Sequence, residues 1–442
     1  MIRALKEIAL GFILLSLGAL GSAAARADDY QFKVIHTFQG SPDAAEAWFG
    51  GHMILDNQGN LYGTTRYGGT NTSADSGAVF KVTPKGKLTV LYSFCPQGNC
   101  ADGENPFMGV AFDQSGNLYG TTAGGGAHNW GTVFRLASDG THTVLYNFCT
   151  QANCTDGGEP WAPPVVDGDG NLYGTTLSGG TNNEGVIFKV SPGGAETVLH
   201  NFCSLPDCAD GERPFAGLVS DKQGNLYGTA PAGGKHRSSG VLFRLRRNGA
   251  YRVLHQFGSQ PLDADGVFPE GLLMIDGQGN IYGTTERGGT GDCHLDVYHS
   301  RRRCGAVFKF APDGTETVLY SFCPQPSCTD GKYPLAGVVA DNDGNLFGTT
   351  SDGGSNGFYG DGTVFEVAAD GTETVLHVFC SESNCNDGAY PLSGLAIDEG
   401  GNLFGATVGG GSTGYGVIFE LEKNKKTAVV SIGRSISDPS SR

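Results

Sequence analysis

Two stretches between residues 258 and 304 gather the side chains that most often do chemistry. The first, GSQPLDADGVFPEG, carries three carboxylates, and the second, GDCHLDVYHSRRRC, is basic. Arginines suit an anionic ligand or partner, whereas the simpler interpretation is a solvated loop tip. We expect the two stretches to lie side by side and to form a candidate binding site. Its residues are Asp263, Asp265, Glu270, His294, His299, Arg301, Arg302 and Arg303.

Aromatic residues make a further candidate. Trp161 follows a recurring proline, as do Phe107 and Phe215, and Trp130 stands in a neighbouring loop. Exposed rings at such positions stack on sugars, but aromatic side chains more commonly pack between elements. The sequence therefore leaves two interpretations open: Trp130 and Trp161 belong to a glycan site, or they pack between elements of the fold.

The stretch DGDGNLYGTTLSGG, residues 167–180, resembles a cation-binding loop because acidic and amide residues alternate from Asp167. It fails the EF-hand pattern, since Leu172 stands where that loop needs glycine. Five of its seven copies in the chain also lack an acid at the third position. We interpret the motif as a turn capped by its first aspartate, with calcium at Asp167 as the alternative. No other metal or cofactor is expected.

The same motif returns at residues 56, 113, 167, 221, 276, 341 and 398. A fixed period of this size indicates a repeat architecture. In the sixth unit, four short apolar or alternating runs cover 334–341, 345–350, 362–368 and 373–379, and no window has a helical period. Seven units of four strands predict an all-β fold, a seven-bladed β-propeller of four-stranded blades.

Ring closure has two candidates. Residues 30–38 resemble a fourth strand but precede the first complete unit, and residues 427–432 stand where the last unit's own fourth strand should be. An open edge strand would be a liability, so one of them should complete the last blade. We expect residues 30–38 to do so. The predicted organisation is a signal peptide (1–27), the propeller (28–432) and a short disordered tail (433–442).

The N-terminus is typical of export. Arg3 and Lys6 precede an apolar run from Ile8 to Ala25, and the small residues around Arg26 fit a cleavage site. An uncleaved anchor is the alternative. No later stretch reaches the ~18 apolar residues of a spanning helix, so we expect a secreted or periplasmic protein without a membrane span in the mature chain. A formal charge of −16 makes nucleic acid an unexpected partner.

All twelve cysteines fall into local pairs, five of them with one spacing. Where a unit lacks the motif, both members are missing together, which local disulfides predict and export permits. Zinc would need four converging thiolates, and we expect pairs on different blades to lie too far apart. The predicted disulfides are Cys95–Cys100, Cys149–Cys154, Cys203–Cys208, Cys293–Cys304, Cys323–Cys328 and Cys380–Cys385.

Strands of a blade alternate in direction, so the loops sort onto two faces. One face carries the D-x-x-G-N and D-G turns, and the other carries the longer, more variable loops, where binding is expected. An aspartate recurs there before each first strand and could form an acidic ring around the channel mouth, or simply start a D-G turn. These aspartates are Asp102, Asp156, Asp210, Asp265, Asp330 and Asp387.

The repeat unit also resembles a known family. DGKYPLAGVVADNDGNLFGTT (330–350) and GTVFEVAADGTETVLHVF (362–379) are similar to the GloVer tandem repeat of exported bacterial "choice-of-anchor" proteins. The resemblance covers nearly the whole mature chain. It implies export and a propeller-like repeat, and it brings no activity or site residues. A weaker likeness links the D-x-x-G-N-L-Y strand pair to NHL-type propellers.

No H-E-x-x-H, G-x-S-x-G or P-loop signature is present. The sequence therefore favours a non-catalytic binding module that takes a ligand, a glycan or an extracellular protein on its loop-rich face. The alternative is a hydrolase or lyase that acts on a carbohydrate or lactone through acidic loop residues. Several unlike polar residues converging on the channel mouth would favour the enzyme, and a repeated pocket would favour binding.

Overall fold

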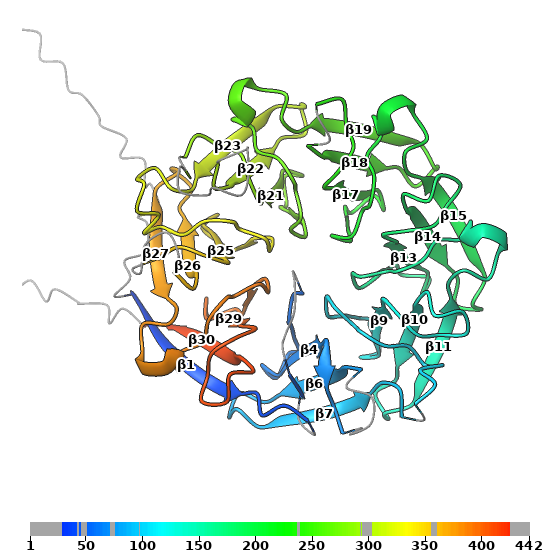
Figure 1. Ribbon diagram of the computed structural model, residues 1–442, viewed down its shortest axis with the longest axis horizontal. Coiled ribbons are helices and arrows are strands. Elements are labelled where there is room, and N and C mark those ends of the chain that lie inside the picture. Colours follow the sequence, from blue (N-terminus) through cyan, green and yellow to red (C-terminus); the bar gives the residue numbers. More distant parts are fainter. Residues whose placement is uncertain are drawn as a thin grey trace, which may run out of the picture.

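The computed structural model describes residues 29–41, 44–45, 51–70, 76–96, 98–236, 239–291, 293, 303–354 and 360–424. Seven four-stranded antiparallel sheets surround a central axis (Figure 1). The chain is therefore the seven-bladed β-propeller that the repeat count predicts. The predicted signal peptide and tail lie outside the described residues.

Each of the first six blades contains four strands in chain order, from the axis outward. The first three blades comprise β3 (Ile54–Leu55), β4 (Leu61–Thr65), β6 (Ala78–Val82) and β7 (Leu88–Ser93); β8 (Val110–Phe112), β9 (Leu118–Thr122), β10 (Thr132–Leu136) and β11 (His142–Asn147); and β12 (Val165–Val166), β13 (Leu172–Thr175), β14 (Val186–Val190) and β15 (Glu196–Asn201).

The next three blades have the same plan. They comprise β16 (Leu218–Ser220), β17 (Leu226–Ala230), β18 (Val241–Leu245) and β19 (Tyr251–Gln256); β20 (Met274–Ile275), β21 (Ile281–Thr285), β22 (Ala306–Phe310) and β23 (Glu316–Ser321); and β24 (Val339–Ala340), β25 (Leu346–Thr350), β26 (Thr363–Val367) and β27 (Glu373–Val378). Short additions are the pair β2 (Ala44–Ala45) and β5 (Tyr67–Gly68), and 3₁₀ turns η2 (Ala152–Cys154), η3 (Pro206–Cys208), η4 (Pro261–Asp263) and η6 (Ser383–Cys385).

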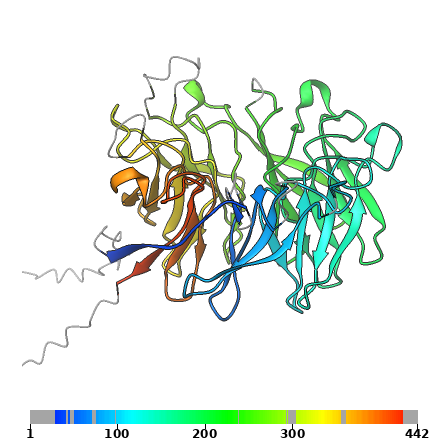
Figure 2. The same ribbon diagram turned by 60° about the horizontal axis from the view of Figure 1, so that its bottom comes forward.

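The seventh blade joins the two ends of the chain. It contains β28 (Ala396–Ile397), β29 (Leu403–Ala406), β30 (Val417–Lys423) and, as its outer strand, β1 (Tyr30–Thr37). β1 runs antiparallel to β30, with Tyr30 opposite Lys423 and Thr37 opposite Val417. Figure 2 shows these first and last strands side by side. The expectation that residues 30–38 close the ring is confirmed, while residues 427–432 lie outside the described part.

A glycine and a phenylalanine on facing strands organise every blade. Gly120 on β9 stands opposite Phe134 on β10, and a Cβ on Gly120 would lie 2.4 Å from that ring. Phe94 of the preceding blade meets Phe134 edge to face at 5.2 Å. Phe134 thus joins one blade to the next. The corresponding glycine–phenylalanine pairs are Gly63–Phe80, Gly174–Phe188, Gly228–Phe243, Gly283–Phe308, Gly348–Phe365 and Gly405–Phe419.

The D-x-x-G-N motif is a capped turn, as interpreted. The two carboxylate oxygens of Asp167 accept bonds from the backbone of Asp169 and Asn171, the Asn171 amide and the Tyr173 hydroxyl, at 2.8–3.1 Å. Burial opposes ionisation of Asp167, but the bonds from Asn171 outweigh it and lower the pKa. These turns share one face of the ring with the D-G turns.

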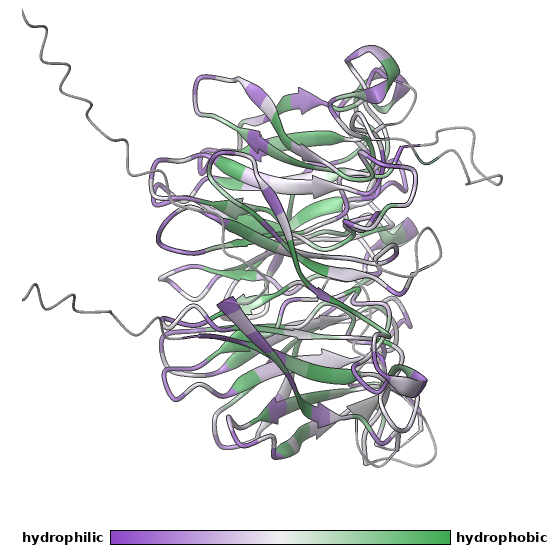
Figure 3. Ribbon diagram, turned by 90° about the vertical axis from the view of Figure 1, so that its left-hand side faces the viewer, coloured by the Kyte–Doolittle hydropathy of each residue, from purple (hydrophilic) through white to green (hydrophobic). Residues whose placement is uncertain are grey.

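Polar residues concentrate in the loops on both faces, and apolar residues concentrate along the strands (Figure 3). All six predicted disulfides are present, and the described cysteines include none that is free. Among the described residues, no helix is long and apolar enough to cross a membrane.

Candidate functional site

The segments just before the first strands meet one another around the axis. His52 makes backbone bridges to Gly109 on one side and to Gly394 on the other. Its imidazole lies against Gly394, where a Cβ would come within 2.4 Å of the ring. Phe107 and Leu392 stand two residues before Gly109 and Gly394, and each directly follows a recurring proline. We call the residues that follow the prolines the axial ring: Phe107, Trp161, Phe215, Glu270, Leu335 and Leu392.

Three consecutive members of the axial ring form an aromatic arc. The ring centroids of Phe107 and Trp161 lie 4.7 Å apart, and those of Trp161 and Phe215 lie 5.4 Å apart. Phe107 is 8% exposed, whereas Trp161 and Phe215 are partly exposed. The guanidinium of Arg66 lies 5.1 Å from the Phe107 centroid and closes one end of the arc.

Charged side chains follow the arc in the next blades. Glu270 takes the axial position in the fifth blade, where burial and then the nearby Glu286 carboxylate raise its pKa above the ordinary value. Glu286 accepts a 3.0 Å bond from Arg287. The Arg287 guanidinium lies 5.4 Å from the Tyr333 ring centroid, and Lys332 Nζ lies 4.8 Å from it. Unlike polar groups from two neighbouring blades therefore meet beside the apolar arc.

The structure separates the predicted carboxylate group. Asp265 is fully buried and binds Ser259, Gln260 and His255, which belongs to the outer strand of the fourth blade. Burial alone would raise its pKa, but the bonds from His255 and Ser259 lower that pKa to about 2. Asp265 is therefore a structural residue at the outer edge, while Glu270 lies at the axis.

Residues 258–271 lie beside the start of the enlarged loop, as expected. The Asp263 carbonyl accepts a 3.0 Å bond from the backbone of Gly289, which precedes the enlarged loop. In the loop itself, Arg303 donates a 2.8 Å bond to the Gly289 carbonyl. The other four predicted residues of the loop, His294, His299, Arg301 and Arg302, lie outside the described residues.

The two tryptophans have different surroundings. Trp161 belongs to the aromatic arc, whereas Trp130 packs against the cluster of Val133, Phe148 and Leu172 between the second and third blades. Trp130 thus fits the packing interpretation.

The recurring aspartates do not form an acidic ring at the channel mouth. Asp156 has no exposed surface, and its carboxylate binds the Tyr146 hydroxyl at 2.7 Å and the Thr150 backbone at 2.8 Å. Asp210, Asp265 and Asp387 are equally buried, and Asp330 is 8% exposed. Each of these carboxylates holds the connection after a fourth strand, as the turn interpretation expects.

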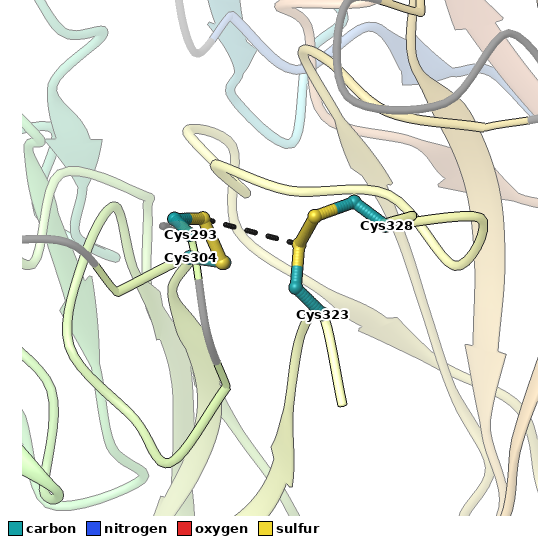
Figure 4. A group of neighbouring side chains, drawn as sticks. All are labelled: Cys293, Cys304, Cys323 and Cys328. Atoms are coloured by element: carbon teal, nitrogen blue, oxygen red, sulfur yellow. Dashed lines mark hydrogen bonds between the residues drawn. A yellow bond between two sulfur atoms is a disulfide. The ribbon is translucent and has the colours of Figure 1, made fainter. Parts of the chain in front are cut away.

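Four cysteines of the fifth blade converge, a case that the expectation about pairs on different blades did not cover. Cys293 and Cys304 in the enlarged loop meet Cys323 and Cys328 in the following connection, and all four sulfurs lie within 4.8 Å of one another (Figure 4). The two pairs belong to one blade, so they are not too far apart. All four are fully buried, and they form two local disulfides, Cys293–Cys304 within the loop and Cys323–Cys328 within the connection.

Grooves on the opposite, turn-bearing face come from the repeat itself. One of about 490 Å³ lies between the third and fourth blades, and Asp169, Lys222 and Arg247 line it. Another of about 320 Å³ separates the fourth blade from the fifth and is lined by Lys222, Gln223 and Asp276. Tyr173 is the one aromatic residue that lines the first groove, and no aromatic residue lines the second.

Sequence patterns missed Arg66, Glu286 and Arg287, although a signal was present. Aligning the seven units places Arg66 and Glu286 directly after the second strand, where the other units carry Ala, Leu, Pro, Ser and Val. Likewise, His52 replaces the glycine, proline or leucine of the other units. Departures from a repeat thus mark the axis better than charge density does.

These observations define a seven-bladed propeller with an asymmetric candidate site at its axis. A model of the Gloeobacter/Verrucomicrobia repeat family matches residues 49–298 and 295–439. The chain belongs to this family, which confirms the resemblance seen in the repeat unit. Among curated proteins, no sequence matches the chain.

Solved structures are similar to the chain only at a low level. A putative gluconolactonase is 13% identical with a TM-score of 0.37, over 89% of this chain and 92% of that chain. A luciferin-regenerating enzyme is 13% identical with a TM-score of 0.44, over 89% and 95%. A puromycin hydrolase mutant is 11% identical with a TM-score of 0.49, over 84% of this chain but only 53% of that chain. At these values the similarity says nothing about activity.

Proposed function

We propose that the protein is a secreted or periplasmic binding module that takes a glycan at the axial ring. The observation that carries the proposal is the aromatic arc. Trp161 and Phe215 present partly exposed rings on a rigid scaffold, and the apolar face of a sugar stacks on such rings. The six disulfides accord with an oxidising compartment.

The polar groups beside the arc would fix the orientation of the sugar. A few placed polar groups within a mostly apolar lining are typical of ligand sites. Arg66 stands at one end of the arc, and Glu270 follows it in the next blade. A guanidinium group can donate hydrogen bonds to the hydroxyl oxygens of a sugar, and a carboxyl group can accept hydrogen bonds from its hydroxyl groups. No cofactor or metal is part of this proposal, so binding should survive a chelator.

A second candidate is a hydrolase or lyase that acts on a carbohydrate or lactone. One observation favours it: Glu270 is held largely protonated by burial and Glu286. A carboxyl that keeps its proton near neutral pH is suited to act as a general acid. The ion pair of Glu286 and Arg287 near Glu270 adds further charged groups that support this candidate.

A glycan array tests binding, with Trp161→Ala as the test variant. We expect the wild-type protein to bind a defined subset and the variant to lose at least about tenfold in affinity, since truncating an aromatic anchor of a binding site costs on the order of 2 kcal/mol. Leu205→Ala is the matched control, because Leu205 is 51% exposed on a connection near the outer edge. Equal binding by wild type and Trp161→Ala would refute the site.

Turnover separates the two candidates. The same glycans and a panel of sugar lactones are incubated with wild type and with Glu270→Gln. Product formation by wild type that disappears in Glu270→Gln would establish the enzyme. Binding without product would leave the module.

A further inference from the structure

Six residues share one unusual backbone conformation. Each directly precedes a recurring proline, and each has a φ of 55° to 58°, in the left-handed region. Residues with a Cβ rarely adopt that region, and a following proline restricts the backbone further. We call these residues the pre-proline ring: Asn105, Glu159, Arg213, Phe268, Tyr333 and Tyr390.

The backbone of these residues joins neighbouring blades. The N–H of Glu159 donates to the Trp130 carbonyl of the preceding blade at 2.8 Å, and the Glu159 carbonyl accepts from Leu177 of its own blade at 3.0 Å. All six N–H groups donate to the preceding blade in the same way, at 2.8–2.9 Å. This role uses no side-chain atom, so glycine would fulfil it.

Glycine would also remove the local cost. A left-handed conformation costs a residue with a Cβ roughly 1–2 kcal/mol, and glycine avoids this cost. The chain uses glycine at many other left-handed positions, including Gly157 and Gly211, two residues before Glu159 and Arg213. None of the six pre-proline positions is glycine. Strained residues of this kind cluster at functional sites, which points to a use for their side chains.

The six side chains complement the axial ring blade by blade. Asn105, Glu159 and Arg213 are polar, and each stands two residues before a member of the aromatic arc. In the next three blades the pre-proline residues are the aromatic ones, Phe268, Tyr333 and Tyr390, and the axial residues are Glu270, Leu335 and Leu392. The six blades therefore combine five different pairs of side chains, because the tyrosine–leucine pair occurs twice.

Glu159 and Arg213 already take part in polar contacts. Glu159 accepts a 2.6 Å bond from the Ser178 hydroxyl, and Arg213 donates a 3.0 Å bond to Glu184 of the preceding blade. Arg213 is exposed, with 62% of its side chain accessible, so its ion pair with Glu184 contributes little to stability. Both side chains retain hydrogen-bonding capacity for a ligand.

We propose that the pre-proline ring determines which glycan is bound, and that Glu159 and Arg213 read the hydroxyls of a neutral oligosaccharide stacked on Trp161 and Phe215. This inference rests on the proposed glycan function. A carboxylate accepts bonds from two adjacent hydroxyls, and a guanidinium donates to ring and hydroxyl oxygens. Pairing with Glu184 compensates the Arg213 charge, which suits a neutral sugar.

Glycine substitutions test the proposal, because they should lower the affinity for glycans without lowering Tm. Glu159→Gly and Arg213→Gly should leave Tm unchanged or slightly raised, since the backbone bonds persist and the Cβ strain is removed. On an array of neutral oligosaccharides, each variant should lose at least about tenfold in affinity for the glycans that wild type prefers. Glu159→Gln should retain part of the binding.

Asp207→Gly is the matched control. Asp207 is also left-handed, with a φ of 56°, but lies in an exposed disulfide loop. It should gain the same strain relief without any change in binding. A Tm lowered by several degrees in both ring variants would show that their side chains are structural and would overturn the proposal. An unchanged glycan profile would overturn it as well.

The proposed function can fail separately from this inference. If wild type binds no neutral or charged glycan, both fall together. If wild type binds and Trp161→Ala does not, while Glu159→Gly and Arg213→Gly keep the wild-type profile, the axial site stands and only the role of the pre-proline ring is lost. A preference confined to acidic glycans would overturn the assignment of a neutral oligosaccharide.

Discussion

Gly120→Ala probes the contact that recurs in every blade. The new methyl group would lie 2.4 Å from Cζ and 2.8 Å from Cε1 of Phe134. Phe134 has no exposed surface and meets Phe94 of the preceding blade at 5.2 Å, so its ring has no room to retreat. Overpacking of this kind costs about 1–3 kcal/mol, and alanine recovers about 0.5–1 kcal/mol of it through the unfolded chain. We expect a net loss of about 0.5–2 kcal/mol.

Urea unfolding monitored by aromatic fluorescence measures this loss as a lower midpoint at an unchanged slope. Gly168→Ala is the control, because a Cβ on Gly168 meets nothing within 4 Å and its φ is not positive. It should stay within about 0.5 kcal/mol of wild type. Trimming the ring with Phe134→Leu should cost less in the Gly120→Ala background than in wild type, because the two residues are coupled. Additive losses, or no loss in Gly120→Ala, would refute the reasoning.

Two further predictions concern buried groups. Burial and the nearby Asp330 raise the pKa of Glu373 from 4.5 to about 8, so the folded state holds this proton more tightly than the unfolded chain does. The resulting stability is complete below about pH 4.5 and is lost as pH rises through 8. The Tm of Glu373→Gln should therefore rise relative to that of wild type between pH 5 and 9. Parallel curves of Tm against pH for the two proteins would contradict this. The double change Cys203→Ser and Cys208→Ser should remove about 2 kcal/mol of stability, and thiol titration of unfolded, unreduced wild type should find essentially none.

Local patterns carried most of the fold. The recurrence of D-x-x-G-N requires only hydrogen bonds that span four residues, such as those that Asn171 donates to the Asp167 carboxylate. Five of the disulfides close loops whose cysteines are five residues apart. Interactions of such short range can be predicted from spacing alone. The seven copies of the repeat then give seven blades. Because the last copy supplies three strands of its blade, β1 completes that blade and closes the ring.

The candidate site could not be predicted in the same way, because radial position is a tertiary property. Asp265 and Glu270 are five residues apart, yet one binds His255 on an outer strand and the other lies at the axis. The two residues look like one acidic group in the sequence. In the structure the connection between the blades runs inward from the outer edge to the axis and separates them.

The sequence by itself determined the seven units, their turns and their local disulfides, since each depends on neighbours along the chain. Only the tertiary structure decided that Phe107, Trp161 and Phe215 form one arc, although 54 residues separate the members of each consecutive pair. It also decided that the backbone is left-handed at the six non-glycine residues that precede the recurring prolines. The physical reason is that closing the ring brings the same position of successive blades together around one axis.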